Sequence, residues 1–213
     1  MRTDDLIEML STNVETVDRR QVSRTLAGAI ALGALVALGA GLIVLGGRTD
    51  VGGNAALGFI VIKLMFAMTV TALAVFYLIR SARPGGSRRG SAALVLLPFA
   101  GIVGLASISL AYAPAVHSQT MLMGDEWLEC LLSIPIIAVV PFALVVWAVR
   151  QAAPTHLRRA GALAGLVAGG LSAAGYALHC TADSLPFVAI WYSGTIMLCT
   201  LAGAVLGPRL LRW

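Results

Sequence analysis

Two cysteines with imidazole and carboxylate neighbours are the residues of this chain best suited to chemistry. Cys130 follows Glu129 and Cys180 follows His179, in otherwise apolar parts of the 213-residue sequence. Thiolates and imidazoles bind soft or borderline metal ions, and accessible thiols react with oxidants. The pattern therefore indicates a site that senses a metal ion or an oxidant. Its candidate metal ligands are Cys130, Cys180 and His179, and Glu129 is a candidate accessory residue.

The spacing of the two cysteines predicts that they meet. Cys130 begins one apolar stretch, Cys180 follows the end of the next, and both are equally distant in sequence from Thr155 in the turn between. Antiparallel helices of equal rise would bring both thiols to the same depth, at an aqueous surface. A plain stabilising disulfide, or two cysteines that share a face without a role, remains the alternative. Cys199, deep in the last apolar stretch, is expected to be a packing residue.

Lys63 is the ionisable residue that lies well inside an apolar stretch. A charge at such a position is by default a hypothesis of a functional site. Lys63 is also only a few residues from the end of its stretch, so its ammonium could extend to the aqueous surface. The alternative is an ion pair with Glu129 or Asp183, and the sequence favours neither.

Composition and periodicity predict that helices in a lipid bilayer position these residues. The chain is 59% hydrophobic and 12% charged, whereas soluble domains carry about 25% charged residues. A helix that crosses the hydrocarbon needs about 20 apolar residues, and an open sheet there would leave backbone groups unpaired. We therefore predict an all-α, polytopic bundle of six transmembrane helices, at residues 26–46, 57–79, 92–112, 128–149, 161–178 and 186–206.

The basic residues predict the orientation of this bundle. Every lysine and arginine except Arg48 and Lys63 falls at the chain ends or in the second and fourth loops between spans. The positive-inside rule then places both termini and these loops in the cytoplasm. The net charge of +5 is explained by this topology, so we expect no direct binding of nucleic acid.

Small residues recur at every fourth position in two of the predicted spans. Such stripes let helix backbones approach closely. Packing within one bundle is the favoured interpretation, and a dedicated dimer face is the alternative. The stripes are Ala29, Gly33, Ala37 and Gly41 in the first span, and Gly161, Gly165, Gly169 and Ala173 in the fifth.

The first 25 residues are the longest segment expected in water, and they predict a short amphipathic helix. A threonine can cap it, acidic residues favour its first turn, and apolar residues share one face. An acidic helix with an apolar face suits a basic, grooved protein partner; a membrane-surface helix or a solvated tail are the alternatives. The residues predicted to contact the partner are Thr3, Asp4, Asp5, Leu6, Ile7, Met9 and Leu10.

Several segments together resemble one known family. They are residues 1–10 (MRTDDLIEML), 130–135 (CLLSIP), 178–183 (LHCTAD) with the following Trp191 and Tyr192, and 207–213 (GPRLLRW). In order and spacing they are similar to the NrsF-type negative regulators of sigma F, which are six-span anti-sigma factors of the bacterial inner membrane. The resemblance covers essentially the whole chain.

This resemblance implies a transcription regulator of a stress response and not an enzyme. A cytoplasmic segment, residues 1–25, would hold an extracytoplasmic-function sigma factor through residues 3–10. The bundle would span 26–207, and a short cytoplasmic tail 208–213. The paired cysteines of the family fall on Cys130 and Cys180, so a periplasmic signal would act there. No catalytic residue or resident cofactor is expected, although a metal ion could bind transiently as the signal.

Two other functions are consistent with parts of the sequence. A small multi-span transporter could use Lys63 and the acidic residues near it in a substrate path, but no internal repeat is evident. A membrane thiol oxidoreductase could use Cys130 and Cys180, but the chain has no second thiol pair. Both remain alternatives to the regulator.

Overall fold

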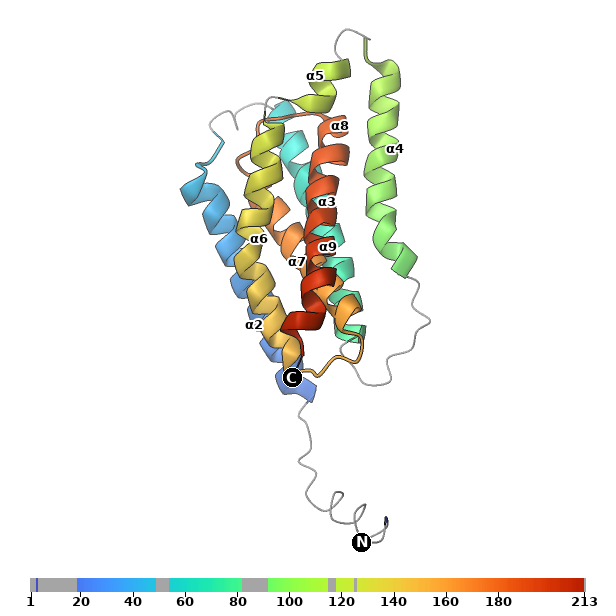
Figure 1. Ribbon diagram of the computed structural model, residues 1–213. Coiled ribbons are helices and arrows are strands. Elements are labelled where there is room, and N and C mark those ends of the chain that lie inside the picture. The colour runs from blue at the N-terminus through green and yellow to red at the C-terminus, as the bar shows by residue number, and fades with distance from the viewer. Residues whose placement is uncertain are drawn as a thin grey trace.

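The computed structural model describes residues 3, 19–48, 54–81, 92–114, 118–124 and 126–212, and all regular structure within them is helical (Figure 1). The absence of strands from this part of the chain agrees with the predicted all-α class. In chain order the elements are α2 (Arg19–Gly39) with the π-helical turn η1 (Ala40–Val44), α3 (Asn54–Ser81), η2 (Ala92–Leu96), α4 (Leu97–Tyr112), α5 (Ser118–Met123), α6 (Trp127–Arg150), α7 (Leu157–Ala177), α8 (Leu185–Phe187), η4 (Val188–Tyr192) and α9 (Ser193–Leu210).

Six helical segments are long and apolar enough to cross a membrane, as the sequence predicts. The fourth begins earlier than expected, because the short helix α5 precedes α6. Gly124 separates the two with a φ of +56°, a backbone conformation that favours glycine. The six segments are Ser23–Val44, Ala56–Ser81, Leu94–Tyr112, Gln119–Arg150, Leu157–Ala177 and Leu185–Leu210.

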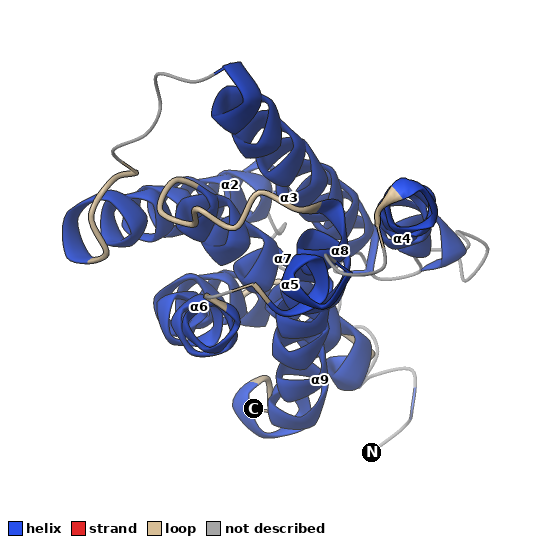
Figure 2. Ribbon diagram, turned by 90° about the horizontal axis from the view of Figure 1, so that it is seen from above, coloured by secondary structure: helices blue, strands red, loops and turns tan. Residues whose placement is uncertain are grey.

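Helix α7 is the centre of the bundle. Its apolar segment is 89% buried, against 17% for α4. It packs against α2, α3, α6 and α9, and Figure 2 shows it surrounded by these helices when viewed along the bundle. Because α7 has neighbours on every side, its sequence carries small residues where the other spans carry leucine and isoleucine.

Glycines allow the neighbours of α7 to approach to backbone contact. A Cβ added to Gly161 would come within 2.6 Å of the Cα of Gly207, and it would also collide with the backbone of Gly203. At the other end of α7, Gly175 meets Ala37 of α2 in the same way, and Gly41 meets Gly175. Both predicted stripes thus include residues that pack within this one chain, which is the favoured interpretation of the sequence.

Helix α4 lies at the edge of the bundle. It contacts mainly α8, η4 and η2, with fewer contacts to α3, and it stands apart from the other helices in Figure 1. One edge-to-face ring pair, Phe66 with Phe99, joins it to α3 with the ring centroids 5.5 Å apart. Most of the α4 surface is therefore exposed.

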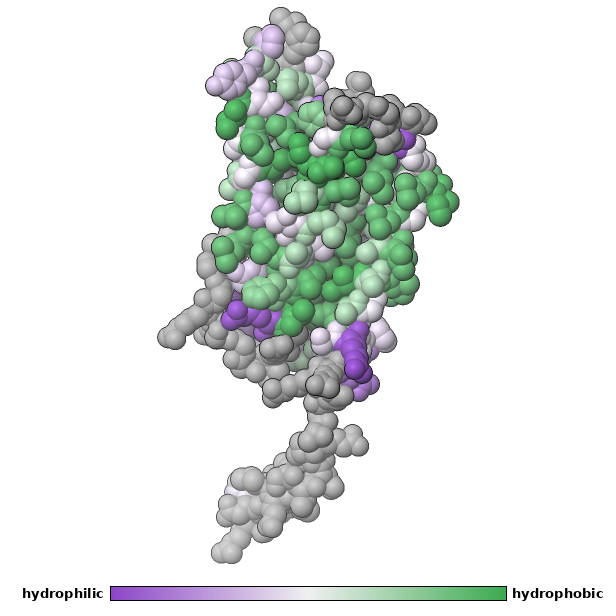
Figure 3. Space-filling view, turned by 180° about the vertical axis from the view of Figure 1, so that it is seen from behind, coloured by the Kyte–Doolittle hydropathy of each residue, from purple (hydrophilic) through white to green (hydrophobic). Residues whose placement is uncertain are grey.

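The outer surface of the bundle is apolar. Large side chains such as Leu35, Ile43 and Ile136 are more than half exposed, and on the face in Figure 3 apolar residues cover the middle while hydrophilic ones gather toward the ends. We call the end formed by residues 45–48, 118–130 and 178–187 the thiol end. The opposite end, at which Arg80 and Arg150 lie in the last turns of α3 and α6, is the arginine end.

Candidate functional site

The structure brings Cys130 and Cys180 together at the thiol end. Cys130 lies in the first turn of α6, and Cys180 lies in the 178–184 loop that joins α7 to α8. The two sulfurs are close enough to interact electrostatically, and both are free thiols. The equal sequence distances from the α6–α7 turn thus produce the expected meeting.

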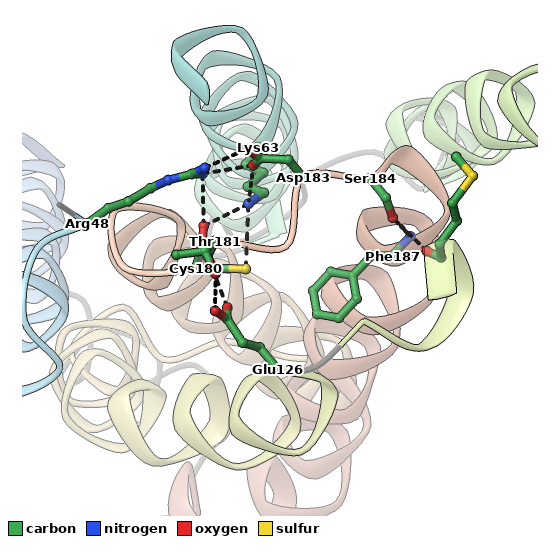
Figure 4. Close-up of polar contacts among 9 residues, drawn as sticks. Arg48, Lys63, Glu126, Cys180, Thr181, Asp183, Ser184 and Phe187 are labelled. Atoms are coloured by element: carbon green, nitrogen blue, oxygen red, sulfur yellow. Dashed lines mark hydrogen bonds and ion pairs between the residues drawn. The ribbon is translucent and has the colours of Figure 1, made fainter. Parts of the chain in front are cut away.

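The thiols are not at the surface, and in this respect the sequence-based expectation is wrong. Both cysteines are fully buried, with 0% exposure. The 178–184 loop folds back over the start of α6, where both the backbone N–H and the hydroxyl of Thr181 donate hydrogen bonds to Glu126 (Figure 4). Sequence distance predicts the depth of the two thiols along the bundle, but not that a loop covers them.

Lys63 pairs with a carboxylate and does not extend to the surface. Its side chain is fully buried, and Nζ lies 3.4 Å from Asp183 Oδ1. The same ammonium donates to the Cys180 carbonyl oxygen at 2.9 Å and lies 3.5 Å from the Cys180 sulfur. Of the two carboxylates that the sequence allows, the structure selects Asp183.

Arg48 is the functional candidate that sequence reasoning missed. Its guanidinium donates to both carboxylate oxygens of Asp183, at 2.8 and 2.5 Å, and to the Cys180 carbonyl oxygen at 3.2 Å (Figure 4). Its side chain is only 2% exposed. The sequence did distinguish Arg48 from most other basic residues. Only Arg48 and Lys63 lie outside the chain ends and the two loops predicted to be cytoplasmic.

His179 faces the end of α2. Its Nδ1 donates to the carbonyl oxygen of Gly46 at 2.8 Å, and its Nε2 is 3.9 Å from the exposed carboxylate of Glu129. Within the described ranges, no three histidine, cysteine or acidic side chains are grouped as they would be around a metal ion. The predicted ligand set of Cys130, Cys180 and His179 is therefore not assembled in this structure.

The 178–184 loop is also fastened to α5 and α8. The hydroxyl of Ser184 donates to the carbonyl oxygen of Met121 at 2.6 Å and accepts from the N–H of Phe187 at 3.1 Å, which caps α8. The indole of Trp191 donates to the carbonyl oxygen of Leu122 at 3.0 Å. With the contacts of Arg48, these bonds hold the loop on two sides.

Two buried tyrosines line the other side of the thiol pair. Tyr176 and Tyr192 are fully buried, and their hydroxyl groups make no well-aligned hydrogen bond. Each interacts electrostatically with both Cys130 and Cys180, so the phenol groups belong to the surroundings of the thiols. The Tyr192 hydroxyl also lies near enough to Cys180 for a weak hydrogen bond between them.

Burial and Lys63 act on the Cys180 thiol in opposite directions. Burial raises the pKa of Cys180, because the thiolate loses its hydration, and the nearby Lys63 ammonium partly offsets this increase. The pKa remains above its ordinary value. Cys180 is thus a neutral thiol at neutral pH, with a cation positioned beside its sulfur.

The predicted partner-binding segment lies almost entirely outside the described residues. Thr3 is described and is exposed. The remaining predicted contacts lie outside the described residues; they are Asp4, Asp5, Leu6, Ile7, Met9 and Leu10.

Comparison with known proteins gives a consistent result over the whole chain. A family model described as negative regulator of sigma F matches residues 10–213. A protein of Azospira oryzae named probable anti-sigma-F factor NrsF is 33% identical over 213 residues, which cover all of both chains. The anti-sigma-F factor NrsF of Caulobacter vibrioides is 35% identical over 219 residues, again with both chains fully covered. No solved structure matches.

Proposed function

Because the chain belongs to the negative regulator of sigma F family, we propose that it holds an extracytoplasmic-function sigma factor at the bacterial inner membrane and releases it when Cys130 and Cys180 sense a metal ion or an oxidant. The observation that carries the proposal is similarity over the full length to two proteins named as anti-sigma-F factors. The family is regulatory and not catalytic, so this function requires no catalytic residue.

The apolar surface and the arginine distribution support a membrane location. Six segments are long and apolar enough to span a bilayer, and exposed residues such as Ile43 and Leu35 would meet lipid. Arg80, Arg150 and Arg209 lie at the last turns of their helices, all leading to loops or the tail on the predicted cytoplasmic side. On this basis both termini are cytoplasmic, and the thiol end faces the periplasm.

Residues 1–25 are the proposed binding segment, with 26–207 as the bundle and 208–213 as a tail. The acidic and apolar residues between Thr3 and Leu10 suit a groove with basic edges. The last residues of the binding segment belong to α2, which continues as the first membrane span. The binding segment is therefore covalently joined to the helix that leads, through η1, to Arg48 beside Cys180.

The burial of the thiols restricts the proposed signal. Only a small species, a metal ion or a small oxidant, could reach Cys130 and Cys180 without extensive opening of the 178–184 loop. Metal binding would require loss of the thiol protons, and the Lys63 ammonium 3.5 Å from the Cys180 sulfur would stabilise a thiolate. To change from mostly bound to mostly released, the signal must bias two states by about 5 kcal/mol.

The holding function is tested by Leu6→Glu in the full-length chain. A charge on the apolar face of the binding segment would be desolvated in a groove, so the sigma factor should no longer co-purify and its reporter should be active without a signal. Glu8→Gln, on the polar side of the same segment, is the matched control and should retain binding. Unchanged co-purification with Leu6→Glu contradicts the docking of this segment.

The sensing function is tested by replacing both thiols in the same cells. Cys130→Ser with Cys180→Ser should hold the sigma factor normally but should not release it when cells are exposed to diamide or to Zn²⁺ as probes. Cys199→Ser is the matched control, since Cys199 lies buried between α7 and α9 and away from the thiol end. Normal induction in the double variant would contradict sensing by these cysteines.

A further inference from the structure

Residues 45–48, which follow α2 and its π-helical turn η1, are fastened to the loop that carries Cys180. The backbone N–H of Arg48 donates to the Leu178 carbonyl oxygen at 3.2 Å, and its side chain binds Asp183 and the Cys180 carbonyl oxygen. His179 adds a bond to the carbonyl oxygen of Gly46. We call this set the strap, which consists of Gly46, Arg48, Lys63, His179, Asp183 and the carbonyl groups of Leu178 and Cys180.

The two cations of the strap are buried, and they share a carboxylate that is partly exposed. Arg48 lies in the chain that follows η1, Lys63 lies within α3, and both reach the single carboxylate of Asp183. A buried cation is stable only when its partners remain in place. The positions of α2, α3 and the loop are therefore coupled, because a shift of any one of them would leave a buried cation without its partner.

Backbone packing extends the coupling from the strap into α2. Gly41 lies in the π-helical turn η1, and a Cβ there would come within 2.7 Å of the carbonyl carbon of Gly175 in α7. Gly175 precedes the 178–184 loop by one turn. The last turns of α2 are thus held against α7 and the loop together, and π-helical turns frequently mark functional positions in helices.

The Cys180 sulfur lies within reach of this assembly. Lys63 Nζ contacts the sulfur, the Cys180 carbonyl oxygen and Asp183 at once. A metal cation bound at the sulfur would repel the ammonium. A disulfide between Cys180 and Cys130, formed when an oxidant such as diamide takes up two electrons and the two thiol protons, would shift the Cys180 sulfur toward Cys130. Either change alters the partners of Lys63, and through Asp183 those of Arg48.

We propose that Arg48 and Lys63 are positioning residues that keep α2 in the sigma-holding arrangement, and that a change at Cys180 acts by loosening the strap. This rests on the function proposed above, and it names α2 as the element that carries the signal to the cytoplasmic segment. The strap is a two-state element that the thiol end and the binding segment both bias, as coupling between distant sites requires.

The test is Arg48→Met in the full-length chain, with and without the two cysteine-to-serine changes. Methionine keeps an apolar stem of similar length but removes all side-chain bonds of the strap at this position. The reporter without any signal should rise by about tenfold or more, and it should rise equally in the Cys130→Ser, Cys180→Ser background, because the strap acts after the thiols. Lys63→Met should change the reporter in the same direction.

Two controls separate positioning from general stability. Arg48→Lys retains the charge beside Asp183 and should restore most of the repression. Thr71→Val removes a buried hydroxyl of α3 whose hydrogen bond stays within its own helix, and it should leave the reporter unchanged. The amount of protein in the membrane fraction and the affinity of the purified protein for the sigma factor are measured for each variant.

The outcomes distinguish the two proposals. If the wild-type chain does not bind the sigma factor, the proposed function fails. If the wild type binds, but Arg48→Met and Lys63→Met keep normal repression and affinity, only the strap proposal is overturned. The reporter could also rise only in proportion to a loss of protein from the membrane, without repression in Arg48→Lys. That result would show a merely structural role for Arg48 and would also overturn the strap proposal.

Discussion

At the scale of single residues, the thiol end depends on a charge arrangement that spans three parts of the chain. Lys63 and Arg48 both contact Asp183 and the Cys180 carbonyl oxygen, although they lie in segments far from the 178–184 loop in sequence. The shared carboxylate of Asp183 offsets part of the cost of burying the two cations. The same ammonium sets the electrostatic environment of the Cys180 sulfur.

This environment predicts the pH dependence of Cys180 ionisation. Burial raises the pKa of Cys180, so its thiolate should form only above the ordinary thiol pKa of about 8.5. The thiolate is measured by its ultraviolet absorbance in protein with Cys130→Ser and Cys199→Ser, as the difference from protein that also carries Cys180→Ser. This measurement needs no reagent to enter the buried site.

The control for this measurement is an exposed thiol introduced by Gln151→Cys in a chain without its native cysteines. Its thiolate should form near the ordinary pKa, at a lower pH than that of Cys180. In addition, Lys63→Met should raise the pH at which the Cys180 thiolate forms, because removal of the ammonium raises the pKa further. A Cys180 profile that coincides with the control would contradict the raised pKa.

At the scale of elements, the central helix explains why two spans carry small residues. Gly161 and Gly165 of α7 meet the backbone of α9, and Gly175 meets that of α2. Bulkier side chains would separate these helices, and the 178–184 loop follows directly from α7. Close packing of α7 thus sets the position of the loop that carries Cys180.

The packing predicts opposite effects of the same substitution at two helical glycines. Gly161→Ala places a methyl group against the backbone of Gly203 and Gly207, and overpacking of this kind costs about 1–3 kcal/mol. Gly28→Ala meets nothing within 4 Å, so it should be neutral or should stabilise α2 by up to about 1 kcal/mol. Thermal unfolding of the purified protein in detergent measures both.

The expected order of midpoints is Gly161→Ala below the wild type and Gly28→Ala at or above it. If Gly161→Ala unfolds at the wild-type temperature, α7 and α9 are not in backbone contact. That result would also remove the argument that α7 fixes the loop.

At the scale of the whole molecule, the bundle has two chemically different ends. Arginines terminate helices at one end, and the thiols with their buried cations occupy the other. The proposed regulator needs this separation, since the signal and the sigma factor would be on opposite sides of the membrane. Between the ends, six helical segments are long and apolar enough to cross a membrane.

The proposed orientation predicts the labelling of two positions that flank α6. In a chain without native cysteines, Gln119→Cys at the thiol end should react with a membrane-impermeant maleimide in intact spheroplasts, whereas Gln151→Cys at the arginine end should react only after lysis. Both side chains are exposed, so burial does not account for a difference. The reverse pattern would place the thiol end in the cytoplasm and contradict the positive-inside assignment.

The sequence by itself determined the class of the fold and the meeting of the two cysteines. Six apolar runs of about 20 residues are required by the thickness of a bilayer, and equal distances from a turn fix equal depth in antiparallel helices. The resemblance of four short segments also identified the family that the comparison shows. These features are local or periodic, so they can be read without coordinates.

Only the tertiary structure decided the surroundings of the thiols. Cys130 and Cys180 are buried, Lys63 pairs with Asp183 and not with Glu129, and Arg48 binds the same carboxylate. All three features depend on how the 178–184 loop folds over α6 and against the residues that follow α2. No period or spacing encodes the path of an irregular loop. Its course is set by a few long-range contacts between side chains, because each buried charge must find its partner among residues distant in sequence.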